Sequence, residues 1–320
     1  MSRIRKIAFE EHFMAPGFER YTPFLKFIEP RAAAELLARL TDTDEMRLAE
    51  MDAAGISMTI LSQTGLGIQG EPDTATAIRA AAENNDYLAT RIARHPTRFG
   101  GFAALAMQDP AAAADELERA VTQLGFKGAL VNGHTLGRYY DDPAYDVVWE
   151  RLQALDLPFY LHPIDFPQIP KTLEGFPVLQ GATWGWGVET GSHALRLLFS
   201  GVFDRFPQLK IVLGHMGEGL PFQRWRYDSR FAAYPFGVTL QRKPSEYIGS
   251  NIVITTSGVC SEAALKGAIA EMGVDAVMFS VDYPYENTAI AADFIEQSDL
   301  DDATRAAVCH GNAERLLKLV

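Results

Sequence analysis

Short apolar runs rich in β-branched residues alternate along this chain with longer amphipathic segments. The apolar runs predict strands over residues 4–13, 56–62, 99–105, 126–132, 158–162, 210–215, 251–257 and 276–282. The segments between them predict helices over residues 44–54, 74–94, 110–124, 143–155, 190–206, 261–272, 288–297 and 303–319. Alternation of this kind indicates a parallel sheet, and eight strands close a TIM-type (β/α)8 barrel. We therefore expect one barrel domain over residues 1–320.

Two connections are too long to be plain loops between a strand and a helix. Residues 14–43 follow the first predicted strand, and residues 163–189 follow the fifth. The second connection is rich in aromatic residues, including Trp184 and Trp186. Both leave the carboxyl-terminal face of the expected barrel, so we expect them to form lids or pocket walls.

Four of the predicted strands end in side chains that can bind metal ions. These side chains are Glu10 and His12 at the first strand, His162 at the fifth, His215 at the sixth and Asp282 at the eighth. A closed barrel brings all its strand ends to one face, where barrel enzymes keep their chemistry. Carboxylates and imidazoles together suit Zn²⁺ or Mn²⁺, so the pattern predicts a divalent metal site.

Strand periodicity assigns roles within this set. Residues two apart share a face, so Glu10 and His12 point together while Glu11 points away. Asp282 is suited to binding the metal, to moving a proton, or to both. His215 is either a ligand or an acid–base group, and Glu218 three residues later is positioned to orient it.

Arg226 is a candidate for binding substrate. It follows His215 by eleven residues, and its planar guanidinium matches a carboxylate. A surface helix position is the alternative for this residue. The remaining histidines are expected to have structural roles, and they are His95, His134, His193 and His310.

Composition excludes several classes of partner. The hydrophobic fraction of 48% and charged fraction of 22% are typical of a globular enzyme. A net charge of −12 argues against binding to nucleic acid or to an anionic membrane. The sequence has neither a signal-peptide pattern nor the roughly 20 apolar residues of a membrane span, so we expect a cytoplasmic protein. Cys260 and Cys309 are expected to be small apolar core residues rather than a disulfide.

Several motifs together resemble a known family. They are Ala8-Phe9-Glu10-Glu11-His12-Phe13, Gly128-Ala129-Leu130-Val131-Asn132-Gly133, Phe159-Tyr160-Leu161-His162-Pro163, Leu213-Gly214-His215-Met216-Gly217-Glu218, Ile254-Thr255-Thr256-Ser257-Gly258, Phe279-Ser280-Val281-Asp282-Tyr283-Pro284 and Gly311-Asn312-Ala313-Glu314-Arg315-Leu316. The chain resembles the amidohydrolase-2 branch of the amidohydrolase superfamily over nearly its whole length. Within that branch it is similar to the non-oxidative hydroxybenzoate decarboxylases of the γ-resorcylate and 2,3-dihydroxybenzoate group.

This resemblance implies a specific site. One divalent ion would be held by Glu10, His12, His162 and Asp282, with His215, Glu218 and Arg226 around the substrate. Asp282, His215 and Glu218 would be the catalytic residues. Many hydrolases of the superfamily carry a bridging lysine after strand four, but Asn132 ends that strand here and Lys127 lies at its other end. A two-metal site is therefore not expected.

We expect a metal-dependent, non-oxidative decarboxylase of an ortho-hydroxylated aromatic carboxylate. Protonation of the ring carbon and loss of CO₂ involve no redox change, so no organic cofactor is expected. The alternative is a mononuclear metal-dependent hydrolase of a lactone or amide, and a third possibility is a binding protein that keeps a structural metal. The expected partners are a small aromatic carboxylate and further copies of the chain in a homo-oligomer, a dimer or tetramer.

Overall fold

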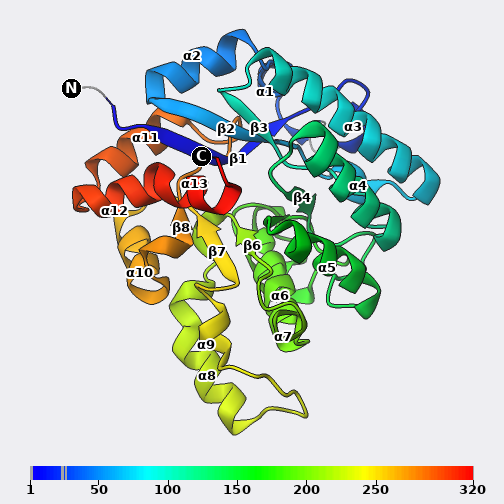
Figure 1. Ribbon diagram of the computed structural model, residues 1–320, viewed down its shortest axis with the longest axis vertical. Coiled ribbons are helices and arrows are strands. Elements are labelled where there is room, and N and C mark those ends of the chain that lie inside the picture. Colours follow the sequence, from blue (N-terminus) through cyan, green and yellow to red (C-terminus); the bar gives the residue numbers. More distant parts are fainter. Residues whose placement is uncertain (1–2, 23–24, 26, 320) are drawn as a thin grey trace.

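The computed structural model describes residues 3–22, 25 and 27–319, which contain eight parallel strands. The strands are β1 (Lys6–Phe13), β2 (Ile56–Gln63), β3 (Phe99–Gly101), β4 (Ala129–Asn132), β5 (Phe159–His162), β6 (Ile211–Leu213), β7 (Ile252–Thr255) and β8 (Val277–Met278). They form a group β1-β2-β3 and a group β4-β5-β6-β7-β8 (Figure 1). Bridges between Ala103 and Ala129 and between Glu11 and Tyr283 join the two groups. The predicted (β/α)8 barrel is confirmed.

Helices surround this sheet (Figure 1). They are α1 (Pro30–Thr41), α2 (Glu45–Ala54), α3 (Thr74–Arg94), α4 (Pro110–Leu124), α5 (Asp146–Leu155), α6 (Gly185–Phe199), α7 (Val202–Arg205), α8 (Arg224–Ala233), α9 (Pro244–Tyr247), α10 (Glu262–Met272), α11 (Thr288–Gln297), α12 (Asp302–Ala306) and α13 (Asn312–Leu317). Caps explain many of their starts. Helix α4, for example, begins with Pro110, and the Asp109 carboxylate before it accepts hydrogen bonds from the backbone amides of Ala111 and Ala112.

The helix predictions hold for most of the chain, with corrections at four places. The connection 14–43 contains α1, whose start is fixed by Pro30 and by the Glu29 side chain accepting from the amide of Ala32. Residues 190–206 are two helices, because Gly201 adopts a φ of +74° and ends α6 before α7 begins. Helices α8 and α9 were not predicted, and they project from the barrel (Figure 1).

The closing helix predicted over 303–319 is also interrupted. A π-helical turn over Ala307–Gly311 separates α12 from α13. Ala313 and Leu317 of α13 pack into the barrel's interior cluster with Ile7 and Val212. One end of the barrel is therefore closed by apolar side chains from the C-terminal helix.

Strand β1 contains a bulge between Ala8 and Glu11. Ala8 pairs with Thr59 and Glu11 with Leu61, so three steps along β1 match two along β2. A bulge of this kind re-aims the following side chains. Phe9 consequently belongs to the interior apolar cluster, and Glu10 and His12 still face the same barrel end.

No helix in the described residues has the length and apolar composition needed to cross a membrane. We propose that the chain is a single domain, built on this one barrel.

Candidate metal centre

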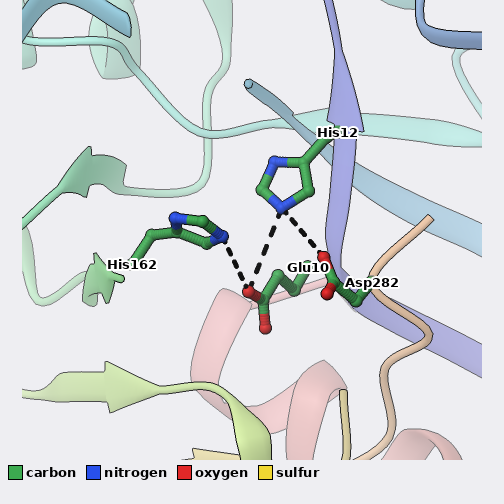
Figure 2. A group of neighbouring side chains, drawn as sticks. All are labelled: Glu10, His12, His162 and Asp282. Atoms are coloured by element: carbon green, nitrogen blue, oxygen red, sulfur yellow. Dashed lines mark ion pairs between the residues drawn. The ribbon is translucent and has the colours of Figure 1, made fainter. Parts of the chain in front are cut away.

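Four side chains from three separate segments converge at one end of the barrel (Figure 2). Glu10 and His12 come from β1, His162 ends β5, and Asp282 follows β8. One nitrogen or oxygen from each lies within 4.8 Å of the others. The Nε2 of His12 is 3.2 Å from Oδ1 of Asp282, and the Nε2 of His162 is 3.3 Å from Oε1 of Glu10. The sequence-predicted ligand set is therefore assembled in space.

The His162 ring presents a free lone pair to this cluster. Its Nδ1 lies 2.9 Å from the carbonyl oxygen of Pro163, which can only accept, so Nδ1 carries the hydrogen. Nε2 is then the unprotonated nitrogen, the form in which imidazole binds a metal. Burial and the neighbouring His12 hold the pKa of His162 well below its ordinary value, which keeps the ring neutral.

The Glu10 carboxylate is oriented by hydroxyl groups that the sequence did not identify. Its Oε2 accepts hydrogen bonds from Tyr160 and Ser257, and Thr255 is 2.9 Å from the Tyr160 hydroxyl. A Cβ added at Gly214 would lie 2.5 Å from the same oxygen, so only glycine fits there. Oε2 is thereby engaged, and Oε1 is left facing the cluster.

Atoms at the centre of the cluster lack partners. Within the part of the chain that the structure describes, Oε1 of Glu10, Nε2 of His12 and Oδ1 of Asp282 are buried and make no hydrogen bond. Burial, together with the charge of Asp282, raises the pKa of Glu10. Buried polar atoms that make no hydrogen bond are costly, and a cation bound among them relieves that cost. The four residues therefore fit a divalent metal ion.

His215 and Glu218 lie beside these ligands. Nδ1 of His215 is 2.7 Å from Oε1 of Glu218, and its Nε2 is 3.6 Å from Oδ2 of Asp282. Burial lowers the pKa of His215, but Glu218, Glu10 and Asp282 outweigh it and raise that pKa well above its ordinary value. The imidazolium form thus fits between two carboxylates.

The backbone at these residues is unusual. His215, Glu218 and Asp282 have φ values of +49°, +52° and +76°. Side chains other than glycine seldom adopt this left-handed region, and such residues cluster at functional sites. The backbone amide of His215 donates to the Ser257 hydroxyl at 3.0 Å, and that of Asp282 donates to the Glu10 carbonyl at 3.1 Å. These bonds tie the turns at His215 and Asp282 to Ser257, which donates to the Glu10 carboxylate, and to Glu10 itself.

Arg226 is not part of this cluster. It lies on α8, is exposed, and lines a surface groove of about 400 Å³. Tyr227, Phe231 and Phe236 line the same groove. The alternative of a surface helix position describes what is observed, and contact with a substrate carboxylate stays a prediction.

Three of the four other histidines and one cysteine have local roles. His95 pairs with Asp44, His310 pairs with Glu314, and the buried His193 accepts from the Tyr140 amide. Cys309 is buried as expected. The expectation for Cys260 was wrong, because it lies in the loop after β7 and is exposed.

Sequence reasoning also missed a buried carboxyl group, Glu189 on α6. It is 1% exposed, and neither of its oxygens makes a hydrogen bond of good geometry among the described residues. Burial raises its pKa to about 7; the Tyr139 hydroxyl opposes that shift and the Glu218 charge adds to it. In the sequence, Glu189 ends the connection 163–189, before the helix predicted from residue 190, and no pattern there marks it as buried.

The described residues contain no second group of three or more metal-binding side chains of this kind. One site and one ion are therefore consistent with the geometry. A lysine that bridges two ions would have to follow β4. Lys127 lies just before β4 instead.

Comparison with known proteins gives a consistent result. Residues 25–319 match the family Amidohydro_2, described as amidohydrolase. A γ-resorcylate decarboxylase from Polaromonas sp. is 45% identical over 327 residues, covering 98% of each chain. A crystal structure of a 2,6-dihydroxybenzoate decarboxylase bound to 2,6-dihydroxybenzoate superposes with a TM-score of 0.93 at 44% identity, covering 98% of this chain and 99% of that one.

A third relative carries a metal ion. The structure of a dihydroxybenzoic acid decarboxylase from Polaromonas sp. contains manganese and the inhibitor 2-nitroresorcinol. It has a TM-score of 0.92 and 44% identity, covering 98% of this chain and 97% of that chain.

Proposed function

Because this chain belongs to the amidohydrolase family, we propose that its barrel-end cluster removes CO₂ from an ortho-hydroxylated benzoate. The enzyme is a metal-dependent, non-oxidative decarboxylase, a carboxy-lyase. The proposed substrate is 2,6-dihydroxybenzoate (γ-resorcylate), the compound named for its relatives. The observation that carries the proposal is the set of buried, unpartnered atoms of Glu10, His12 and Asp282.

Glu10, His12, His162 and Asp282 are the proposed ligands, and the ion they hold would supply positive charge beside the substrate's ionised oxygens. The hydroxyls of Tyr160 and Ser257 keep Glu10 in its orientation. The Pro163 carbonyl keeps the His162 tautomer. These contacts preorganise the site before substrate enters.

The proton route follows the geometry of three residues. Glu218 holds Nδ1 of His215, which leaves the Nε2 proton directed toward Asp282, 3.6 Å away. Asp282 delivers a proton to the ring carbon that carries the carboxylate, and His215 replaces it. The carbon–carbon bond then breaks, its electron pair restores the aromatic ring, and CO₂ leaves. One proton is consumed in each turnover.

The resident metal is proposed to be Mn²⁺, since manganese occupies the related Polaromonas structure. Two carboxylates and two imidazoles also suit Zn²⁺, which remains the second candidate. No organic cofactor is needed, because protonation of the ring and loss of CO₂ require no external oxidant or reductant.

The homo-oligomer is a further part of the proposal. Trp225, Tyr234 and Phe236, on and after α8, are 78%, 60% and 91% exposed. A cluster of exposed aromatic side chains is typical of a protein–protein interface. We propose that a second copy of the chain binds to this cluster. Light scattering should give a dimer or tetramer, and the double substitution Trp225→Ser with Phe236→Ser should shift it toward monomer. A cytoplasmic location is proposed because both cysteines are unpaired.

The test is CO₂ release from a panel of hydroxybenzoates by enzyme loaded with Mn²⁺ or Zn²⁺. The panel should include benzoate without a hydroxyl group, which is expected to be inert. His162→Ala should cost most of the metal affinity, because one of four proposed ligands is lost. The matched variant His310→Ala should retain that affinity. Hydrolysis of lactones or amides without CO₂ release from any benzoate would support the hydrolase alternative instead.

A further inference from the structure

A buried amide group stands at the barrel end without a partner for its oxygen. Asn132 is the last residue of β4, is 2% exposed, and pairs in register with the metal-site residue His162 on β5. Its Oδ1 makes no hydrogen bond to any residue that the structure describes. Leaving a buried polar atom unpaired costs roughly 1–3 kcal/mol. A ligand that supplies a donor would remove this cost.

Strand periodicity places this amide on the inner face of the barrel. Leu130 and Tyr160, two residues before Asn132 and His162, both belong to the interior apolar cluster. Residues two apart along a strand share a face, so Asn132 faces inward as His162 does. Neighbouring strands lie about 4.8 Å apart, so the amide stands one strand away from a proposed ligand.

The surrounding loop is shaped to the amide. A Cβ at Gly65 would lie 3.0 Å from Oδ1, and one at Gly67 would lie 2.9 Å from Nδ2. The loop after β2 therefore approaches Asn132 more closely than a side chain would allow. The Asn132 backbone amide donates to Oε1 of Gln69 at 3.2 Å, and Nε2 of Gln69 donates to the Leu105 carbonyl at 2.8 Å. These contacts fix the residue in place before any ligand binds.

We propose that Asn132 selects substrates with a hydroxyl group at the second ortho position. This inference rests on the proposed function. A 2-hydroxybenzoate held through its carboxylate and one hydroxyl has a second ortho carbon on the other side of the carboxylate. A hydroxyl there donates its proton to Oδ1 of Asn132, whereas a hydrogen leaves that oxygen unpaired. Sites that hydrogen-bond a substrate hydroxyl discriminate strongly against analogues that lack it.

The kinetic test compares kcat/KM for 2,6-dihydroxybenzoate and 2-hydroxybenzoate. The ratio of the two values in Asn132→Leu, divided by the wild-type ratio, cancels the intrinsic effect of the hydroxyl on ring reactivity. We expect the ratio in Asn132→Leu to be about 5- to 150-fold below the wild-type ratio, which is the range set by one unpaired buried polar atom. The matched control is Asn84→Leu, another buried amide without partners among the described residues, located on α3. Its ratio should equal the wild-type ratio.

A binding test separates this inference from the proposed function. Mn²⁺-loaded protein is titrated with 2-nitroresorcinol and with 2-nitrophenol, which lacks the second hydroxyl. Asn132→Leu should lose affinity for 2-nitroresorcinol only, with unchanged metal content and melting temperature. Asn132→Ser serves if the leucine variant does not fold.

Equal losses for both nitro compounds, or none, would overturn the role of Asn132 whether or not the wild type releases CO₂. Absence of CO₂ release from the wild type would overturn the decarboxylase proposal, and the preference for 2-nitroresorcinol would still decide the role of Asn132.

Discussion

Glu10 and Glu11 are neighbours on opposite faces of β1, and their carboxyl groups differ in how far the protein satisfies their hydrogen bonds. Glu11 points away from the barrel interior, and its Oε1 accepts hydrogen bonds from the Ser280 hydroxyl at 3.0 Å and the Val281 amide at 2.9 Å. The Arg47 guanidinium carbon lies 4.2 Å from the Tyr283 ring centre, and Arg47 also donates to the His12 carbonyl. Glu10 points inward, and one of its oxygens, Oε1, accepts no hydrogen bond from any described residue.

This difference indicates a structural role for Glu11 and a ligand-binding role for Glu10. Both carboxylates are buried, and burial raises the pKa of each, that of Glu11 to about 8. The outer carboxylate is satisfied by the protein itself, so its role is to hold β1 against the segment after β8. The inner carboxylate is left incomplete together with His12 and Asp282, and an incomplete buried set indicates a ligand.

The largest expected effect comes from Asp282→Asn, which keeps an oxygen for the metal but has no proton to deliver. Turnover should fall by about 10²–10⁴-fold, the usual contribution of general acid–base catalysis. Metal should be retained at reduced affinity. CO₂ release and metal content after reconstitution are the measurements, with the surface variant Asp299→Asn as control. Near-normal turnover would assign proton delivery to another group, with His215 the next candidate.

The variants Glu10→Gln and Glu11→Gln test whether only the inward-facing glutamate binds the metal. Glu10→Gln removes a charged ligand, so affinity for Mn²⁺ should fall by at least about 10- to 100-fold, the loss seen when even an outer partner of a ligand is removed. Glu11→Gln should change metal affinity by no more than a few fold and should lower the melting temperature instead. Titration calorimetry and thermal unfolding separate the two effects. Equal losses of metal affinity in both variants would remove the distinction between the two faces.

Glu189→Gln tests the third buried carboxyl group through the pH dependence of stability. A carboxyl whose pKa rises from 4.5 to about 7 on folding binds its proton more tightly in the folded protein. The wild type therefore loses stability as pH rises through this interval, by roughly 3 kcal/mol in all, and glutamine does not titrate. Stability of the variant relative to the wild type should rise between pH 4.5 and pH 7.

That relative stability should then level off near pH 8. Urea unfolding at pH 5 and pH 8 measures it, and the same difference at both values would place the pKa of Glu189 near its ordinary value. The charged and polar neighbours that set this pKa are Tyr139 and Glu218.

The smallest expected effect is that of Arg226→Lys. If Arg226 pairs with a substrate carboxylate, the loss of its two-pronged geometry should lower kcat/KM by roughly tenfold, about the value of one hydrogen bond to a charged group. Arg230→Lys, in the same surface groove, is the matched control. Identical kinetics in both variants would leave Arg226 as a residue of the α8 surface alone.

The sequence predicted the parts of the molecule that depend on local pattern. Strand ends placed Glu10, His12, His162 and Asp282 at one face because parallel strands share a direction. The bulge in β1 was not predictable, since it is set by pairing with β2 rather than by the alternation of apolar residues. The contacts of Tyr160 and Ser257 with Glu10 join residues 150 and 247 positions apart, and no local pattern records such distances.

Helix α8 shows a second limit. Its segment is polar and its described residues include no buried side chain, so the periodicity that revealed the other helices is missing. The same exposure explains why the place of Arg226 could not be decided from spacing alone.

Decarboxylation by ring protonation is tested directly by turnover of 2,6-dihydroxybenzoate by the Mn²⁺-loaded enzyme in heavy water. We expect one CO₂ released per product molecule, and one deuterium at the ring carbon that carried the carboxylate. A sample of the product incubated with metal-free enzyme gives the background exchange. Product without deuterium at that carbon, or no CO₂ at all, would contradict decarboxylation by ring protonation at this site.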